Sequence, residues 1–137
     1  MPSLPQVTGP TEHALRALLD RELASSSIPD YLAWVCLNLA TGSTSRVDLE
    51  AKLEQATRST PGLAARTTKR LIALGLLTSQ AQPTAAGQAD LDATRQRVKA
   101  TTDQLTAGLP DADLTTAIEV LDRVRARAEA MLDQPLV

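Results

Sequence analysis

The stretch TPGLAARTTKRLIALGLL, residues 60–77, carries signals for both ends of a helix and for two different helix faces. Thr60 can accept a hydrogen bond as the cap, and Pro61 suits the first helical position, where no N–H is needed. Gly75 suits the left-handed residue that closes a helix. At about 100° per residue, the side chains on the inner side fall within one arc; they are Leu63, Ala64, Thr67, Leu71 and Leu74.

The outer face of this predicted helix carries positive charge. Arg66 and Lys69 point away from the inner arc, and Arg70 lies at its boundary. Small residues lie beside these cations, namely Gly62, Ala65 and Ala73. Small residues let a helix approach another surface closely, and a DNA major groove is the obvious candidate. The alternative for the same cations is a solvated helix face.

The residues before this helix predict another one. Residues 45–57 open with Ser45 and Asp48, which have the spacing of a capping box. Arg58 and Ser59 then form a short link. A helix, a short turn and a basic helix in this order are the helix-turn-helix pattern.

The residues after Gly75 predict a very small wing. Residues 76–79 can form a strand, and Gln80 and Ala81 can turn the chain back onto residues 82–83. Residues 1–10 hold three prolines and a glycine and predict a flexible arm. Further helices are predicted over residues 11–25, 29–41, 84–107 and 111–132, with Thr11 and Thr84 as caps.

Composition predicts a mainly α protein, and the distribution of charge is compatible with binding to phosphate groups. The chain is 43% hydrophobic but has one Trp, one Tyr and no Phe, so Leu, Ala, Val and Ile must build its core. Residues 46–70 carry a net charge of +3, whereas the rest of the chain carries −5. A locally positive segment can bind phosphate while the acidic remainder limits non-specific attachment.

Several classes of protein are disfavoured by the sequence. A membrane span would need about 18 consecutive apolar residues, and the sequence has no such run. The N-terminus does not resemble a signal peptide, and one cysteine allows no internal disulfide, so we expect a cytoplasmic protein. The six glycines are scattered, and a single His and a single Cys give no metal-ligand cluster. We therefore expect no catalytic site, no metal and no cofactor.

Other residues are candidates for contacts to DNA. Arg46 and Arg58 flank the helix over residues 45–57 and can hold phosphates. Ser59 and Thr60 can donate hydrogen bonds to phosphate, although capping alone explains Thr60. Gln80 at the wing tip is a further candidate, and an ordinary surface glutamine is the alternative.

Four residues suggest binding or redox roles, each with a structural alternative. Tyr31 and Trp34 can line a ligand cleft beside the first helix, although core packing explains both. His13, the only histidine, can join them or be a surface residue. Cys36 lies in the most apolar predicted helix, where a buried cysteine behaves as a small hydrophobe and an accessible one can sense oxidants.

The first and the last two predicted helices carry more apolar surface than one small unit can cover. Pairing with a second copy of the chain would cover it and predicts a homodimer. The alternative is an intramolecular hairpin of the two C-terminal helices.

The order of these elements resembles the MarR family of bacterial transcriptional regulators, over about residues 11–132. Residues 66–77, R-x3-R-L-x3-G-L-L, resemble the end of the family's recognition helix and the entry to its wing. Residues 83–91, P-T-A-A-G-x3-L, resemble the start of the family's first long C-terminal helix. The resemblance implies a single domain over residues 11–137, with a winged helix-turn-helix lobe at 30–83 and dimerisation helices at 11–26 and 84–132.

The resemblance also implies a function. A MarR-like dimer is a repressor that binds a pseudo-palindromic double-stranded DNA site and is often released by a small aromatic or lipophilic ligand. By position, Ala65 and Arg66 stand where the family often has Ser-Arg facing DNA, and Arg70 stands at the arginine before the leucine.

The wing departs from the family pattern. Family wings are usually longer and carry an Asp-Arg pair, whereas residues 76–93 contain no Lys or Arg. The alternative hypothesis is therefore a MarR-shaped interaction or ligand-binding module with weak or lost DNA binding.

Overall fold

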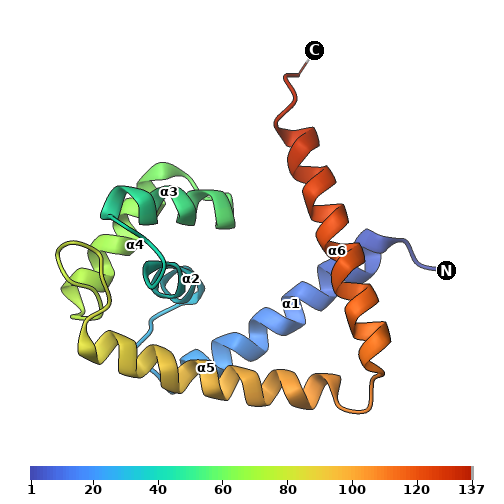
Figure 1. Cartoon of the computed structure of the whole chain (residues 1–137), viewed down its shortest axis with the longest axis horizontal. Helices are drawn as coiled ribbons and strands as arrows, with labels where there is room; N and C mark the ends of the chain where they lie inside the picture. The colour runs from blue at the N-terminus through green and yellow to red at the C-terminus, as the bar shows by residue number, and fades with distance from the viewer. Residues whose placement is uncertain (137) are drawn as a thin grey trace. The chain divides into compact units, whose positions relative to one another are not determined.

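The protein is mainly α-helical, as the sequence predicted (Figure 1). The computed structural model describes residues 1–136. Its helices are α1 (Leu4–Leu23), α2 (Tyr31–Ala40), α3 (Arg46–Thr57), α4 (Pro61–Ala73), α5 (Ala85–Thr106) and α6 (Asp111–Leu132). The chain divides into two compact units, Met1–Ala100 and Thr101–Val137, which are described separately. Within residues 1–136 no helix combines the length and apolar character needed to cross a bilayer.

Residues 4–10 form the start of α1, so the prediction of a flexible arm over residues 1–10 was wrong for most of its length. Ser3 and Gln6 form a capping box, in which the Ser3 N–H donates to Gln6 Oε1 at 2.7 Å. Pro5 lies in the first turn, where its missing N–H leaves no hydrogen bond unmade. Thr11 is an interior helical residue, and its hydroxyl donates to the Val7 carbonyl at 2.6 Å. Pro5 is therefore compatible with the start of this helix, and Pro10 lies within it.

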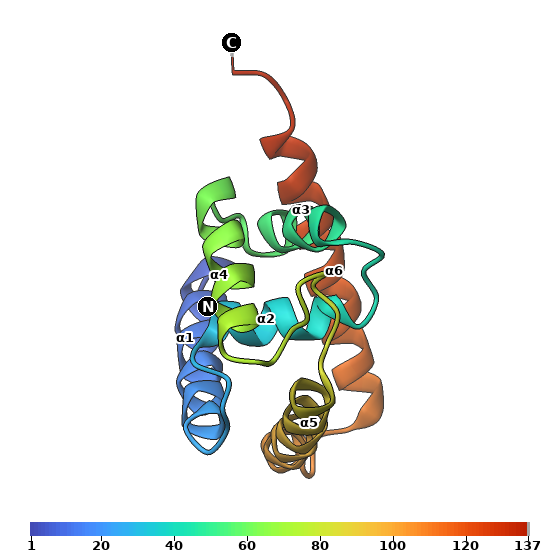
Figure 2. The ribbon, with the colours of Figure 1, turned by 90° about the vertical axis from the view of Figure 1, so that its left-hand side faces the viewer.

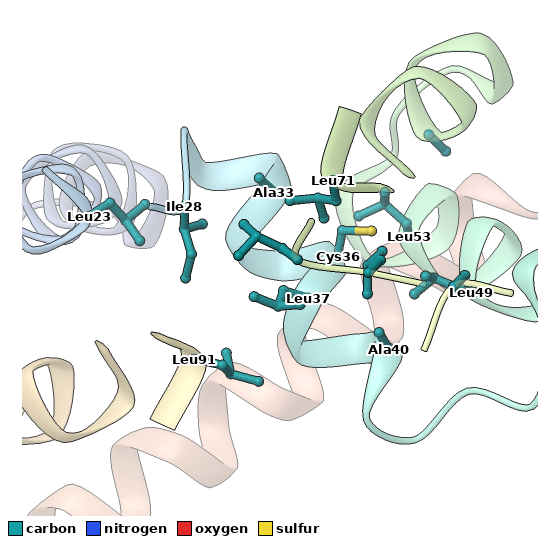
Figure 3. Close-up of a cluster of buried hydrophobic side chains, with 14 residues drawn as sticks. Leu23, Ile28, Ala33, Cys36, Leu37, Ala40, Leu49, Leu53, Leu71 and Leu91 are labelled. Atoms are coloured by element: carbon teal, nitrogen blue, oxygen red, sulfur yellow. The ribbon is translucent and has the colours of Figure 1, made fainter. Parts of the chain in front are cut away.

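Helix α2 forms the centre of the first unit. It packs against α1, α3 and α4, and both views show it between α3 and the first half of α5 (Figures 1 and 2). Its sequence is apolar on nearly all sides because neighbours surround it. In the core, Cys36 of α2 lies near Leu53 of α3 and Leu71 of α4, and Leu91 of α5 approaches Leu37 (Figure 3).

The start of α3 and its junction with α4 follow the predicted helix-turn-helix. Ser45 caps α3, accepting a hydrogen bond from the Asp48 N–H at 3.0 Å. The Asp48 carboxylate accepts from the Thr44 N–H at 3.0 Å, and this bond holds the pKa of Asp48 below its ordinary value. Arg58 ends α3 in the left-handed conformation, with φ of +53°.

Helix α4 begins at Pro61 as predicted, but its cap differs. The Thr60 side chain makes no capping hydrogen bond, so the start of α4 rests on the Thr60 carbonyl, which accepts from the Leu63 N–H at 3.0 Å. At the other end, Gly75 has a φ of +77°, and its N–H donates to the Ile72 carbonyl. The Leu76 N–H donates to the Leu71 carbonyl, which completes a Schellman motif.

The inner face of α4 matches the predicted arc in part, and Thr68, which the arc left out, is fully buried. Ala64, Thr67 and Leu71 are buried. Leu74, predicted to be inside, is 52% exposed because α4 ends at Ala73 and the chain turns away at Gly75. Ile72, which the arc left out, packs against the core.

The wing is smaller than predicted. Residues 76–79 form no strand, and the wing consists of an isolated antiparallel bridge between Leu77 and Pro83. The Thr78 N–H donates to the Gln82 carbonyl at 2.7 Å, and Ala81 closes the turn with a φ of +62°. Pro83 cannot donate to a ladder, so pairing cannot extend through it.

The beginning of α5 is fixed to the end of α4. The Thr84 hydroxyl accepts from the Gly87 N–H at 2.9 Å, which confirms Thr84 as the cap, and donates to the Gly75 carbonyl at 2.6 Å. The Thr84 N–H donates to the Leu76 carbonyl at 3.1 Å. A Cβ at Gly87 would overlap that same carbonyl. Only glycine lets the two backbones approach this closely.

The second unit contains the end of α5 and all of α6, whose bounds match the prediction. Leu114 is half-buried, and the other described residues of α6 are exposed within the single chain. One side of α6 carries apolar residues that remain exposed; they include Ile118, Leu121, Val124 and Met131.

We expect Gly87→Ala to lower the free energy of unfolding by about 1–3 kcal/mol, because the new methyl group overpacks against the Leu76 carbonyl. Urea unfolding followed by circular dichroism measures this change. The matched control is Gly62→Ala in α4, where the nearest atom is the flexible end of Arg66 at 3.3 Å. That control should be neutral or stabilising by up to about 1 kcal/mol. Equal effects of both substitutions would contradict the close approach.

Candidate nucleic-acid interface

The solvent side of α4 presents Arg66 and Lys69. Both side chains are exposed, and among the described residues no carboxylate forms an ion pair with either one. The Arg66 guanidinium lies over Gly62, with Nη1 at 3.3 Å from the position that a Gly62 Cβ would take. The charge of Arg66 therefore lies over the first turn of α4, and a small residue leaves room for it.

Arg70, predicted to contact DNA, is already paired within the protein. Its Nη1 lies 3.0 Å from Oδ2 of Asp30, the residue that precedes α2. Asp30 also caps α2, because its Oδ1 accepts from the Ala33 N–H at 2.9 Å. Arg70 therefore has a different environment from Arg66 and Lys69, although all three were predicted to contact DNA.

Two cations around α3 are also paired. Arg46 Nε lies 3.0 Å from Glu50 Oε1, one helical turn away. Lys52 Nζ lies 3.1 Å from Asp48 Oδ2 and donates to the Gly42 carbonyl at 3.0 Å. These charges are partly neutralised and contribute less to the outward field than the net charge of the segment suggested.

The predicted residues in the turn before α4 lie at the surface with different environments. Arg58 is exposed, and no described carboxylate pairs with it. The Ser59 hydroxyl accepts from the Thr57 hydroxyl at 2.9 Å. Thr60 is exposed, and its side chain makes no capping hydrogen bond to α4. Ala65 is half-buried beside Arg66. The exposed donors Arg58 and Thr60 therefore extend the basic face of α4 towards α3.

An open groove of about 840 Å³ lies between the start of α3 and the wing. Gln82 Nε2 bridges the two sides by donating to the Ser43 carbonyl at 3.2 Å. The predicted residues Arg46 and Gln80 both belong to its lining, which comprises Ser43, Thr44, Ser45, Arg46, Val47, Ser79, Gln80 and Gln82. Apart from Val47, these side chains are hydroxyls, amides and one guanidinium, which are groups that donate to phosphate oxygens.

The predicted effector residues His13, Tyr31 and Trp34 have different environments. The His13 side chain is 83% exposed, and its Nε2 lies 3.8 Å from Glu12 Oε2. The Tyr31 ring is covered by Arg16, whose guanidinium carbon lies 3.9 Å from the ring centroid. Trp34 is half-buried and packs against the core. Arg16, which was not among the predicted residues, is the side chain that lies over Tyr31.

Cys36 is fully buried. Burial raises the pKa of its thiol to about 11, and the Thr68 hydroxyl lies 3.9 Å from its sulfur. A thiol that remains protonated at neutral pH is a poor nucleophile, so Cys36 acts as a core residue. Within residues 1–136 no group of three or more His, Cys, Asp or Glu side chains is arranged to hold a metal ion.

Sequence reasoning missed Asp30 as the partner of Arg70. Its position before the apolar run of α2 signals a cap, and that signal was present in the sequence. Its partner Arg70 lies forty positions further along the chain. Only the packing of α4 against α2 brings the two together, so no local pattern could have revealed the pair.

Comparison of the structure with solved structures finds clear relatives of the fold. No protein-family model matches the sequence, and no curated protein sequence matches it. A MarR-family transcriptional regulator from Rhodococcus sp. RHA1 superposes with a TM-score of 0.72 at 16% identity, over 90% of this chain and 96% of that one. A MarR family protein of Mycobacterium tuberculosis in complex with salicylic acid gives 0.69 at 20% identity, over 90% and 98%.

The reduced form of MarR from Escherichia coli gives a TM-score of 0.68 at 18% identity, over 90% of this chain and 94% of that one. These superpositions cover nearly all of each chain, so they match the order and packing of the helices and not only a shared helix-turn-helix. The resemblance predicted from the sequence is confirmed at the level of fold: this protein has the winged-helix fold of MarR-family transcriptional regulators.

Proposed function

We propose that the protein is a sequence-specific DNA-binding transcription regulator that acts as a repressor. It inserts α4 into the major groove. The observation that carries this proposal is the outer face of α4. There Arg66 and Lys69 are exposed, no carboxylate within residues 1–136 pairs with either one, and small residues lie beside them. Arginine and lysine at this position can donate to guanine O6 and N7, which is the commonest specific contact in the major groove.

Phosphate contacts supply the remainder of the interface. The hydroxyl and amide donors of the groove between α3 and the wing, together with Arg58, lie on the same lobe as α4. Such contacts fix the register of a protein on the duplex without reading sequence. The wing carries no cation, and three cations of the lobe are paired internally. We therefore expect DNA binding by this protein to release fewer counterions than DNA binding by a protein with a basic wing.

The proposed regulator acts as a homodimer on a pseudo-palindromic site. Support comes from the exposed apolar side of α6, where Ile118, Leu121 and Met131 have exposed fractions of 62%, 46% and 70% in the single chain. A contiguous apolar stripe of this kind is typical of a helix that pairs with another copy. Two recognition helices about 34 Å apart would then match one turn of the duplex.

Release by a small aromatic or lipophilic ligand remains a prediction of the family resemblance. The Mycobacterium tuberculosis protein was solved in complex with salicylic acid. In this chain Arg16 already covers the Tyr31 ring, so an aromatic ligand at Tyr31 would have to displace that guanidinium. An anionic aromatic compound could retain Arg16 as its partner.

The neutral wing and the internally paired cations also favour a second candidate, a MarR-shaped interaction module that no longer reads DNA. Binding of a random-sequence duplex pool at low salt separates the two candidates. The regulator retains measurable electrostatic binding under these conditions, whereas the module retains none.

We expect the double substitution Arg66→Gln with Lys69→Gln to weaken binding to a selected duplex by at least about tenfold, since each good base contact contributes about 1–3 kcal/mol. Fluorescence anisotropy against the duplex that the unmodified protein selects from a random pool measures this. The slope of log affinity against log salt concentration should also become shallower.

The matched control removes the same charge outside the lobe, as Arg21→Gln with Arg123→Gln, both of which are exposed residues. The control should retain most of the affinity and identical thermal unfolding. Equal losses for both pairs would mean that net charge matters and that α4 has no special role, which would refute the groove assignment.

We expect Leu121→Asp in α6 to shift the protein from dimer to monomer in sedimentation-velocity experiments, because it places a charge within the apolar stripe. Thr116→Asp is the control, since it lies about 140° from Leu121 around the same helix at 100° per residue. A dimer that survives Leu121→Asp, or a wild-type monomer, would contradict the proposed interface.

A further inference from the structure

The carboxylate of Asp30 makes two contacts to two different helices. Oδ1 accepts from the Ala33 N–H at 2.9 Å and so caps the start of α2. Oδ2 accepts from Arg70 Nη1 at 3.0 Å, and Arg70 lies in the last turn of α4. One side chain therefore joins the beginning of the central helix to the end of the candidate recognition helix.

The next residue, Tyr31, makes the corresponding contact to α1. Its ring lies under the Arg16 guanidinium at 3.9 Å, and Arg16 is held in turn by Glu12 at 2.6 Å. The first residues of α2 thus contact α1 on one side and α4 on the other. Asp30 connects the start of α2 to the end of α4, so its contacts can fix the orientation of α4 relative to α2.

The same geometry makes Arg70 a poor ligand for DNA. A phosphate that approached the Arg70 guanidinium would also approach the Asp30 carboxylate, because Asp30 Oδ2 lies 3.0 Å from Arg70 Nη1. The two negative groups would repel each other. Among the described residues, Arg66 and Lys69 have no such carboxylate beside them. The three cations that follow one another along α4 therefore divide into two groups with different surroundings.

We infer that Arg70 is a positioning residue: through Asp30 it holds α4 at a fixed angle to α2, and it does not contact DNA. This inference rests on the proposed function and assigns separate tasks to the cations of α4. Arg66 and Lys69 meet the duplex, and the Arg70–Asp30 pair fixes the direction in which they point. The pair is about half exposed at both residues, so it adds little to global stability.

The test is a double-mutant cycle with Asp30→Asn and Arg70→Gln. Asparagine caps a helix as well as aspartate does, so Asp30→Asn removes the ion pair while α2 retains its cap. The probes are the duplex that the unmodified protein selects from a random pool and the random pool itself. The readouts are the affinity for each probe, the slope of affinity against salt, and the thermal unfolding temperature.

Each single substitution should weaken binding to the selected duplex by about two- to fivefold, in keeping with an exposed ion pair. The double variant should be no weaker than either single variant, because both remove the same interaction. Binding to the random pool, the salt slope and the unfolding temperature should stay unchanged. The ratio of specific to non-specific affinity is thus the quantity that falls, and a merely structural role would not alter it in this way.

Three outcomes would overturn the inference. Tighter binding by Asp30→Asn would mean that Arg70 contacts DNA once Asp30 releases it. A shallower salt slope in Arg70→Gln, with weaker binding to both probes, would likewise mean a phosphate contact. An unchanged ratio of specific to non-specific affinity in both variants would mean that the ion pair does not orient α4 for specific binding.

A separate measurement distinguishes failure of this inference from failure of the proposed function. The rate of amide hydrogen exchange in α4, measured without DNA, reports how strongly the ion pair restrains this helix. Both single variants should raise the exchange rate of residues 66–73 about equally. If the unmodified protein binds no duplex, the proposed function fails. If exchange in α4 is the same in all variants, the positioning role fails whatever the DNA measurements give.

Discussion

The burial of one face of α4 against α2 and α3 decides which of its side chains remain available for a partner. Ala64, Thr68 and Leu71 are fully buried, and Leu71 meets Cys36 and Leu53 in the centre of the core (Figure 3). A helix fixed along one face by close-packed side chains cannot rotate about its axis without opening cavities. Arg66 and Lys69 are therefore held outward by the same packing that stabilises the lobe.

Charge is distributed over the lobe less evenly than the sequence suggested. Arg46, Lys52 and Arg70 are each paired with a nearby carboxylate, whereas no carboxylate in the described part of the chain pairs with Arg66 or Lys69. The wing adds hydroxyls and amides but no cation. An interface with few outward charges depends more on the direction of each side chain than on overall attraction, which is why a residue that orients α4 matters.

Much of this fold could be predicted because its signals are local. Pro61 and Gly75 mark the ends of α4, Ser45 and Thr84 cap their helices, and α6 has the predicted bounds. The errors also have physical causes. Prolines within the first ten residues suggested disorder, but Pro5 lies in a helical first turn that Ser3 and Gln6 cap. The candidate site was harder to predict, because the Arg70–Asp30 and Arg16–Tyr31 contacts depend on how helices pack.

A map of the residues that contact DNA tests directly whether the outer face of α4 binds the duplex. Backbone amide shifts, recorded by NMR while a random-sequence duplex is added at low salt, locate that surface residue by residue. We expect the changes to concentrate in the first two turns of α4, around residues 62–69, with smaller ones at residues 44–47 in the groove beside the wing. Changes confined to α6, or none along α4, would contradict it.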